Sequence, residues 1–285
     1  MSSTLLNISG KIDTKAVALY AIVSEVTAQL AMPFVVVGAS ARDVVLHYGH
    51  GANMQRATED IDFGIQVPDW SAFKIVKKRL LAKGFNAARE EHRLISPDNM
   101  QVDIVPFGKI EDEHANIAWP PEGGWVMNVL GFQEVCDHAE TVRIQNSPIV
   151  DIPVATPQGM ALLKLIAWLD READMRIKDA KDFLYLLTNY EIIPSVKNSL
   201  YESPALMEHY EWDLSLAAAH QLGINARGLA KEPTANTITK LFNGGHDKLT
   251  LEQLISEMGG RSDDQYTNNE VLTNAFIKGF LQSKK

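Results

Sequence analysis

Apolar residues in the first half of the chain occur in short runs that are separated by stretches with a helical repeat. Runs rich in Val, Ile and Phe predict strands, whereas apolar positions three or four residues apart predict amphipathic helices. Asp69 is expected to cap one such helix, which Gly84 ends. The predicted strands cover residues 33–37, 60–67, 92–95, 100–105 and 149–154, and the predicted helices cover residues 15–30, 41–48 and 69–83.

The second half of the chain has a helical pattern. Thr156 and Pro157 supply an N-cap followed by proline at the first helical position. A further helix is expected over residues 178–189, and helical hairpins follow from Ile193 on. The hairpins are expected to break at glycines, namely Gly223, Gly228, the pair Gly244 and Gly245, and the pair Gly259 and Gly260. The length suits two compact modules, of which the second is helical.

The segment Gly38–Asp43 joins the short apolar strand predicted over residues 33–37 to a helix. Glycine permits a sharp turn there, and Ser40 is a suitable N-cap for the helix that follows. The unpaired amides at such a helix start favour phosphate, and Arg42 could add a fork of donors. The alternative is an ordinary strand-to-helix turn.

Three aspartates lie on strands that are expected to be neighbours. Asp60 and Asp62 share one strand face because side chains alternate along a strand. Asp103 lies in an otherwise apolar strand, where a charge is costly unless it is paired or bound to a metal. Closely spaced carboxylates suit Mg²⁺, and two such ions can clamp the attacking and leaving oxygens of a phosphoryl transfer. The alternatives are a solvated strand end and a carboxylate exposed at a sheet edge.

These residues resemble the DNA polymerase β-type nucleotidyltransferase superfamily, which combines a Gly-rich turn, an Asp-x-Asp pair and a third acid. The wider pattern is most similar to the AbiEii/MenT-type toxin nucleotidyltransferases and their uncharacterised bacterial relatives. Downstream motifs of tRNA CCA-adding enzymes are missing, so that reaction is not expected. The resemblance spans about residues 30–190 and is carried by residues 36–43, 56–63, 102–108, 163–171 and 178–182.

The resemblance implies an α+β fold: a small mixed nucleotidyltransferase sheet flanked by helices, followed by a helical C-terminal domain. Residues 1–155 would form the catalytic domain, and residues 156–285 a helical domain that contributes to the nucleotide site and to acceptor binding. The residue roles that it implies fall into two groups. Asp60, Asp62 and Asp103 would bind Mg²⁺ or Mn²⁺ and perform catalysis, whereas Gly38, Ser40, Arg42, Lys164 and Asp179 or Asp182 would contact the nucleotide.

The activity implied is transfer of a nucleoside monophosphate from a nucleoside triphosphate to an acceptor hydroxyl. The resemblance suggests a tRNA or a protein as acceptor, and it allows for a toxin with a cognate antitoxin. A small-molecule acceptor such as an aminoglycoside stays open. Two further functions also stay open, namely a metal-dependent glycosyltransferase and a non-catalytic nucleotide-binding or interaction module on the same fold.

Composition narrows these options only a little. The net charge of −9 argues weakly against a broad nucleic-acid surface, although a local basic cleft would not show in the total. The single cysteine, Cys136, fits a cytoplasmic protein, and neither a membrane span nor a secretory signal is expected.

The spacing of Lys164 in its helix fits a surface lysine as well as it fits a phosphate contact. A solvated face is favoured over polyanion contact for five basic residues of one helix, Lys74, Lys77, Lys78, Arg79 and Lys83.

Overall fold

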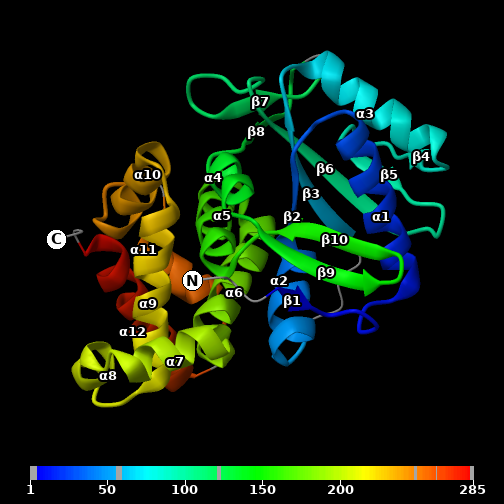
Figure 1. Cartoon of the computed structure of the whole chain (residues 1–285). Helices are drawn as coiled ribbons and strands as arrows, with labels where there is room; N and C mark the ends of the chain where they lie inside the picture. The colour runs from blue at the N-terminus through cyan, green and yellow to red at the C-terminus, as the bar shows by residue number, and fades with distance from the viewer. Residues whose placement is uncertain (1–4, 56–59, 121–122, 247–248, 261, 283–285) are drawn as a thin grey trace. The chain divides into compact units, whose positions relative to one another are not determined.

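The computed structural model describes residues 5–55, 60–120, 123–246, 249–260 and 262–282. The chain divides into two compact units, Met1–Thr156 and Pro157–Lys285, which are considered separately below. Figure 1 labels their helices and strands. The first unit contains a mixed sheet with helices, and the second is helical, so the predicted α+β class with a helical C-terminal part is confirmed.

The sheet of the first unit has eight strands among the described residues, in the order β1-β9-β10-β2-β3-β6-β5-β4. The central strand β3 pairs antiparallel with β2 and parallel with β6. Strands β7 (Asn116–Ala118) and β8 (Val126–Asn128) form a separate hairpin. The strands of the large sheet are β1 (Leu6–Asn7), β2 (Phe34–Val37), β3 (Asp60–Val67), β4 (Asn86–Ala87), β5 (Arg93–Ile95), β6 (Gln101–Gly108), β9 (Glu140–Asn146) and β10 (Ile149–Val154).

Helices cover both faces of this sheet. Phe63 of β3 packs against Tyr20 on one face, whereas the neighbouring Gly64 faces Phe132 on the other. Asp69 caps its helix as predicted, with its carboxylate accepting from the Ala72 amide at 2.8 Å. The helices are α1 (Thr14–Gln29), α2 (Gly38–Arg42), the π-helix η1 (Asp43–Gly49), α3 (Trp70–Ala82) and α4 (Phe132–Asp137).

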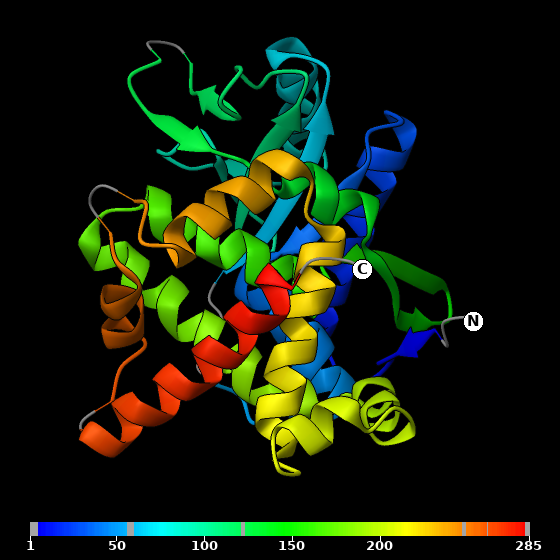
Figure 2. The same ribbon diagram turned by 90° about the vertical axis from the view of Figure 1, so that its left-hand side faces the viewer.

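The second unit is a helical assembly in which α9 and α12 lie side by side (Figure 1, Figure 2). The expected helix over residues 178–189 begins earlier, at Ala173. The helices are α5 (Pro157–Asp170), α6 (Ala173–Asn189), the short 3-10 helix η2 (Tyr190–Ile192), α7 (Pro194–Glu202), α8 (Ala205–His209), α9 (Leu214–Leu229), α10 (Glu232–Phe242), α11 (Leu251–Glu257) and α12 (Asp263–Leu281).

The predicted helix breaks at Gly223 and Gly228 are wrong, because α9 runs through both. A Cβ atom on Gly223 would collide with the backbone of Phe276 in α12. A Cβ atom on Gly279 of α12 would likewise collide with the backbone of His220 in α9. Gly223 therefore allows α9 and α12 to pack closely. The low helix propensity of glycine costs only about 1 kcal/mol there.

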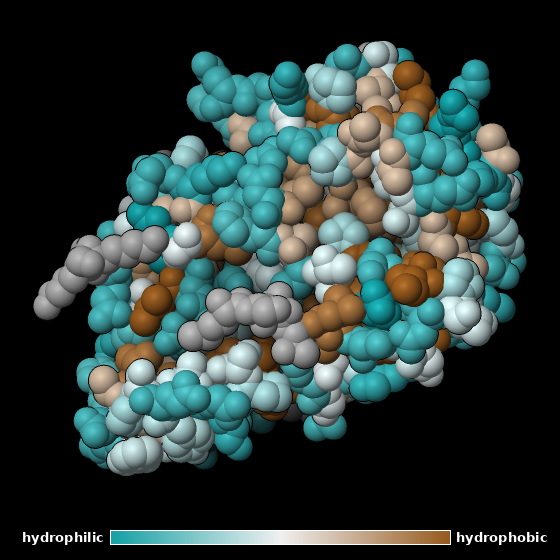
Figure 3. Space-filling model, in the orientation of Figure 1, coloured by the Kyte–Doolittle hydropathy of each residue, from teal (hydrophilic) through white to brown (hydrophobic). Residues whose placement is uncertain are grey.

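Hydrophilic residues cover most of the face shown in Figure 3, and hydrophobic residues appear between them in separate patches. Among the helices formed by the described residues, none is both long enough and apolar enough to span a membrane. The large apolar side chains are instead mostly buried within each unit, such as Phe63 and Phe107 in the first and Trp168 and Phe276 in the second.

Candidate active site

The structure brings Asp60, Asp62 and Asp103 together near the N-terminal ends of two neighbouring strands, β3 and β6, inside the sheet. In β3 the intervening Ile61 is 5% exposed and packs into the core, so the two aspartates share the opposite face. The parallel register of β3 and β6 then places Asp103 directly beside Asp62. One oxygen from each of the three carboxylates lies within 4.8 Å of the others. These three residues are called the acid triad below.

The strands predicted over residues 92–95 and 100–105 form an antiparallel pair, β5 and β6, which supplies a partner for Asp103 that the sequence interpretation missed. Arg93 of β5 lies opposite Asp103 of β6. Its Nε and Nη2 atoms each donate to an Asp103 carboxylate oxygen at 2.7 Å, and Nη2 lies 4.0 Å from Asp60. The hydrogen bonds to Asp103 raise the pKa of Arg93 above its usual value. The Arg93 guanidinium therefore offsets part of the negative charge of the triad, in addition to any bound metal ion.

His92 is the second residue that the sequence interpretation missed. Its Nε2 atom lies 3.9 Å from an Asp103 carboxylate oxygen, and its ring packs against Trp119 and Trp125. Burial lowers the pKa of His92, against the opposing effect of Asp103. The imidazole is thus largely neutral at pH 7 and adds little positive charge beside the triad.

Gly38 determines the space available to Asp62. The antiparallel register of β2 and β3 pairs Val37 with Asp62, and Gly38 follows with φ +70°. A Cβ atom at Gly38 would overlap the Asp62 carboxylate. Both the left-handed conformation and the close approach therefore require glycine at this position.

We expect Gly38→Ala to destabilise the first unit by about 1–2 kcal/mol, because alanine is strained at this φ value, and to displace the Asp62 carboxylate. A shift of this kind can reduce catalysis by about 10²-fold. Gly10→Ala is the matched control, since Gly10 also has positive φ but open space around its would-be Cβ. Thermal unfolding and nucleotidyl transfer of both variants check the prediction, and equal loss of transfer in the two would contradict it.

The predicted N-cap role of Ser40 is wrong. Helix α2 already begins at Gly38, since the positive φ of that residue turns the chain into the helix two residues before Ser40. The Ser40 hydroxyl is buried and donates to the Val37 carbonyl at 3.0 Å. Burial raises the pKa of Tyr20, so its hydroxyl stays protonated. The hydrogen bond from Ser40 to Val37 thereby holds the turn that follows β2.

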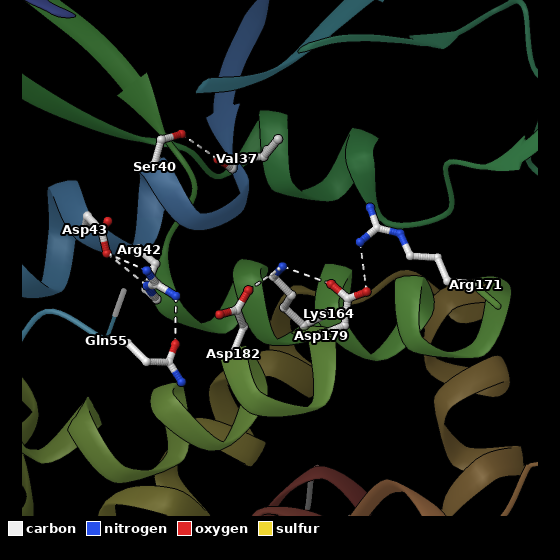
Figure 4. Close-up of polar contacts among 9 residues, drawn as sticks. All are labelled: Val37, Ser40, Arg42, Asp43, Gln55, Lys164, Arg171, Asp179 and Asp182. Atoms are coloured by element: carbon white, nitrogen blue, oxygen red, sulfur yellow. Dashed lines mark hydrogen bonds and ion pairs between the residues drawn. The ribbon is translucent and has the colours of Figure 1, made fainter. Parts of the chain in front are cut away.

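Arg42 is 2% exposed and forms hydrogen bonds within the first unit (Figure 4). Its Nε and Nη2 atoms donate to the Asp43 carboxylate at 2.9 and 2.8 Å, and Nη1 donates to Gln55 at 2.8 Å. The guanidinium therefore holds the start of η1 to the segment that precedes β3. Its expected contact with a nucleotide stays a prediction.

In the second unit, Lys164 lies in a buried ion-pair cluster (Figure 4). Its Nζ atom is 2.9 Å from Asp179 and 2.8 Å from Asp182, and Arg171 also binds Asp179 at 2.8 Å. Desolvation alone would lower the pKa of Lys164, but the two carboxylates overcome this and raise it. The interpretation of Lys164 as a surface lysine is wrong. We call these four residues the Lys164 cluster.

Of the segment 56–63, which contributes to the resemblance described above, residues 56–59 lie outside the described residues. A family model described as "Nucleotidyl transferase AbiEii toxin, Type IV TA system" matches residues 21–215. No curated protein matches the chain.

Two similar solved structures are the antibiotic-resistance factor ANT(2'')-Ia in complex with adenylyl-2''-tobramycin and the Thermotoga maritima CCA-adding enzyme complexed with tRNA. The first is 14% identical with a TM-score of 0.34, and the match covers 76% of this chain and 97% of that one. The second is 12% identical with a TM-score of 0.26, and the match covers 97% of this chain and 86% of that one.

Proposed function

The chain belongs to the AbiEii nucleotidyl transferase family, and from that premise we propose that it moves a nucleoside monophosphate from a nucleoside triphosphate to a hydroxyl group of a tRNA or a protein. The observation that carries the proposal is the acid triad, with three carboxylates within 4.8 Å beside the Gly38 turn. Membership of this family favours nucleotidyl transfer over glycosyl transfer. The presence of all three carboxylates counts against a non-catalytic module.

The donor set of the triad fits a divalent cation. Three carboxylates supply hard oxygen ligands, and their mutual repulsion is relieved by a cation between them. Asp60, Asp62 and Asp103 would hold Mg²⁺ or Mn²⁺. When bound, such an ion neutralises charge on the triphosphate and favours ionisation of the acceptor hydroxyl.

The protein residues around the triad hold its carboxylates in place for an in-line displacement, in which the acceptor oxygen bonds to the α-phosphorus and pyrophosphate leaves. Asp62 is held against Gly38, and Asp103 is held by Arg93. We propose that Asp103 also receives the acceptor's proton. Each Asp103 oxygen accepts one hydrogen bond from Arg93 and keeps a further lone pair for that proton.

Several further assignments are proposals. Residues 1–155 would carry the chemistry, and residues 156–285 would assist nucleotide and acceptor binding. Contacts of Gly38, Ser40, Arg42, Lys164 and Asp179 or Asp182 with the nucleotide stay predictions. The family description also supports a role as the toxin of a toxin–antitoxin pair with a cognate antitoxin. Growth arrest on expression of the wild-type protein, relieved in the Asp60→Asn variant, would support that role.

The decisive experiment incubates the purified protein with Mg²⁺ and each α-phosphate-labelled nucleoside triphosphate, using total tRNA and cell lysate as acceptors. We expect a labelled tRNA or protein band that disappears in Asp60→Asn. Nucleotide binding without any labelled macromolecule would redirect the search to a small-molecule acceptor or a sensing module. Label that persists in Asp60→Asn would contradict the proposed site.

Removal of Arg93 tests whether the triad binds cations. In Arg93→Met, the carboxylates lose their protein counter-charge, so the unfolding free energy without metal should fall by about 1–3 kcal/mol. The same change should strengthen Mn²⁺ binding, because the cation no longer competes with a guanidinium. Thermal unfolding with and without Mn²⁺ measures both effects.

Arg143→Met provides the matched control for Arg93→Met. Arg143 forms a comparable two-bond pair with Asp151 across β9 and β10, at 2.8 and 3.0 Å. Its loss should reduce stability without altering the response to Mn²⁺. Equal stabilisation of the two variants by Mn²⁺ would contradict competition between Arg93 and the cation, and no stabilisation of either variant would contradict a cation site at the triad.

A further inference from the structure

An aromatic cluster borders the acid triad within the first unit. The rings of Trp119 and Trp125 are stacked, with centroids 5.3 Å apart and an interplanar angle of 15°. The His92 ring lies 5.0 Å from that of Trp125, and its Nε2 atom lies 3.9 Å from Asp103. We call Trp119, Trp125 and His92 the aromatic platform. His92 thus lies next to both the exposed Trp125 ring and Asp103 of the triad.

The platform presents an aromatic surface to solvent. Trp119 is 3% exposed, whereas Trp125 is 48% exposed although Trp119 covers one of its faces. The exposed part of the indole must therefore come from the other face and the ring edges. Stacking on Trp119 restricts the orientation of this exposed ring, so a planar ligand would meet a surface that is already ordered. The adjoining Val126 is also largely exposed.

A basic row begins next to the platform. Trp70, the first residue of α3, has its ring 5.5 Å from that of Trp119. Lys74 and Lys78 follow at intervals of four residues, which places them on the same side of the helix as Trp70, and both are exposed. Residues 70–89 contain no Asp or Glu and six basic residues, Lys74, Lys77, Lys78, Arg79, Lys83 and Arg89. Two of the six are paired with glutamates, Lys77 with Glu91 and Lys83 with Glu25, so the row used below consists of the exposed Lys74 and Lys78.

We propose that the aromatic platform and the basic row of α3 bind the acceptor as an unpaired strand of nucleic acid, with one base stacked on Trp125 and phosphates along Lys74 and Lys78. This inference rests on the proposed nucleotidyl transfer and specifies its acceptor. Aromatic rings beside a row of cations are the combination by which proteins hold single strands. A polycationic acceptor would be repelled by the same row.

The direct test is binding of a single-stranded RNA oligonucleotide of about eight nucleotides, without triphosphate, measured by fluorescence anisotropy. Trp125→Ala should weaken binding about tenfold, whereas Trp125→Phe should retain most of the affinity because a ring remains. Trp212→Ala is the matched control, since Trp212 is 58% exposed but lies in the second unit. An abasic oligonucleotide should bind the wild type as weakly as the full oligonucleotide binds Trp125→Ala.

Charge reversal tests the second half of the proposal. The double variant Lys74→Glu and Lys78→Glu should weaken binding and reduce its dependence on salt concentration, because fewer counterions are released. An unchanged salt dependence would overturn the role of the basic row. Glu232→Lys, an exposed change in the second unit, controls for net charge.

Three results would overturn the platform assignment. Trp125→Ala could bind the oligonucleotide as tightly as Trp212→Ala does. The Trp125→Ala variant could instead lose affinity for the nucleoside triphosphate. Trp125 would then stack on the base of the triphosphate and not on a base of the acceptor. The wild type could fail to bind the oligonucleotide and label a protein. None of these readouts depends on successful transfer of a nucleotide to RNA. Failure to transfer a nucleotide to any acceptor is a different result, which would overturn the proposed function.

Discussion

Replacing Asp62 with asparagine is expected to reduce nucleotidyl transfer at least about 10³-fold while leaving the first unit folded. Asparagine keeps the size of the side chain beside Gly38 but removes a charge from the triad. Loss of several kcal/mol of charge stabilisation at a metal-assisted phosphoryl transfer corresponds to a factor of this size. Transfer of label from an α-phosphate-labelled triphosphate measures the effect, and circular dichroism checks the fold.

Asp98→Asn is the matched control for Asp62→Asn. Asp98 is an exposed carboxylate in the turn between β5 and β6, close to the triad in sequence but outside it. We expect Asp98→Asn to transfer normally and to be stabilised by Mn²⁺ like the wild type. Asp62→Asn should lose most of that stabilisation. Full activity in Asp62→Asn would remove the triad from the catalytic site.

The grouping of the three aspartates could be predicted from two local patterns in the sequence, the alternation of side chains along a strand and the turn before Asp103. Alternation along β3 places Asp60 and Asp62 on one face, and the burial of Ile61 and Phe63 agrees with it. The turn at Ser96–Asn99 predicts the hairpin that brings β6 into the sheet. The expected pairing of β6 with β3 is confirmed, although its parallel direction does not follow from a short turn.

Arg93 could have been found from the same hairpin. Once its turn is placed at Ser96–Asn99, the antiparallel register sets Arg93 opposite Asp103, where cross-strand pairs of opposite charge are favourable. His92 carried no comparable signal. Its position beside Asp103 depends on the packing of Trp119 and Trp125, which come from a separate hairpin.

The errors concern residues whose role depends on tertiary contacts. Ser40 has the side chain of a typical N-cap, but the conformation of Gly38 starts the helix earlier. Gly223 has the propensity of a helix breaker, yet the close approach of α12 makes glycine necessary there. Propensity is a weak indicator wherever a neighbouring element determines the available space.

The Lys164 cluster leads to the second large prediction, which concerns stability. Lys164→Met should lower the unfolding free energy of the second unit by about 3–5 kcal/mol, because Asp179 and Asp182 stay buried while a cation between them is lost. Arg171 offsets part of the charge on Asp179, which favours the lower end of that range. Urea unfolding without nucleotide measures the change, and Lys178→Met, an exposed lysine of α6, is the matched control.

The pH dependence of that stability has a defined sign. The carboxylates raise the pKa of Lys164, so its contribution is complete below the ordinary lysine pKa of about 10.4 and disappears only as the pH rises through the raised value. The difference in stability between wild type and Lys164→Met should therefore be large at neutral pH and shrink in strong alkali. If Lys164→Met instead unfolds like Lys178→Met and loses only affinity for the triphosphate, the lysine serves the ligand and the cluster does not stabilise the fold.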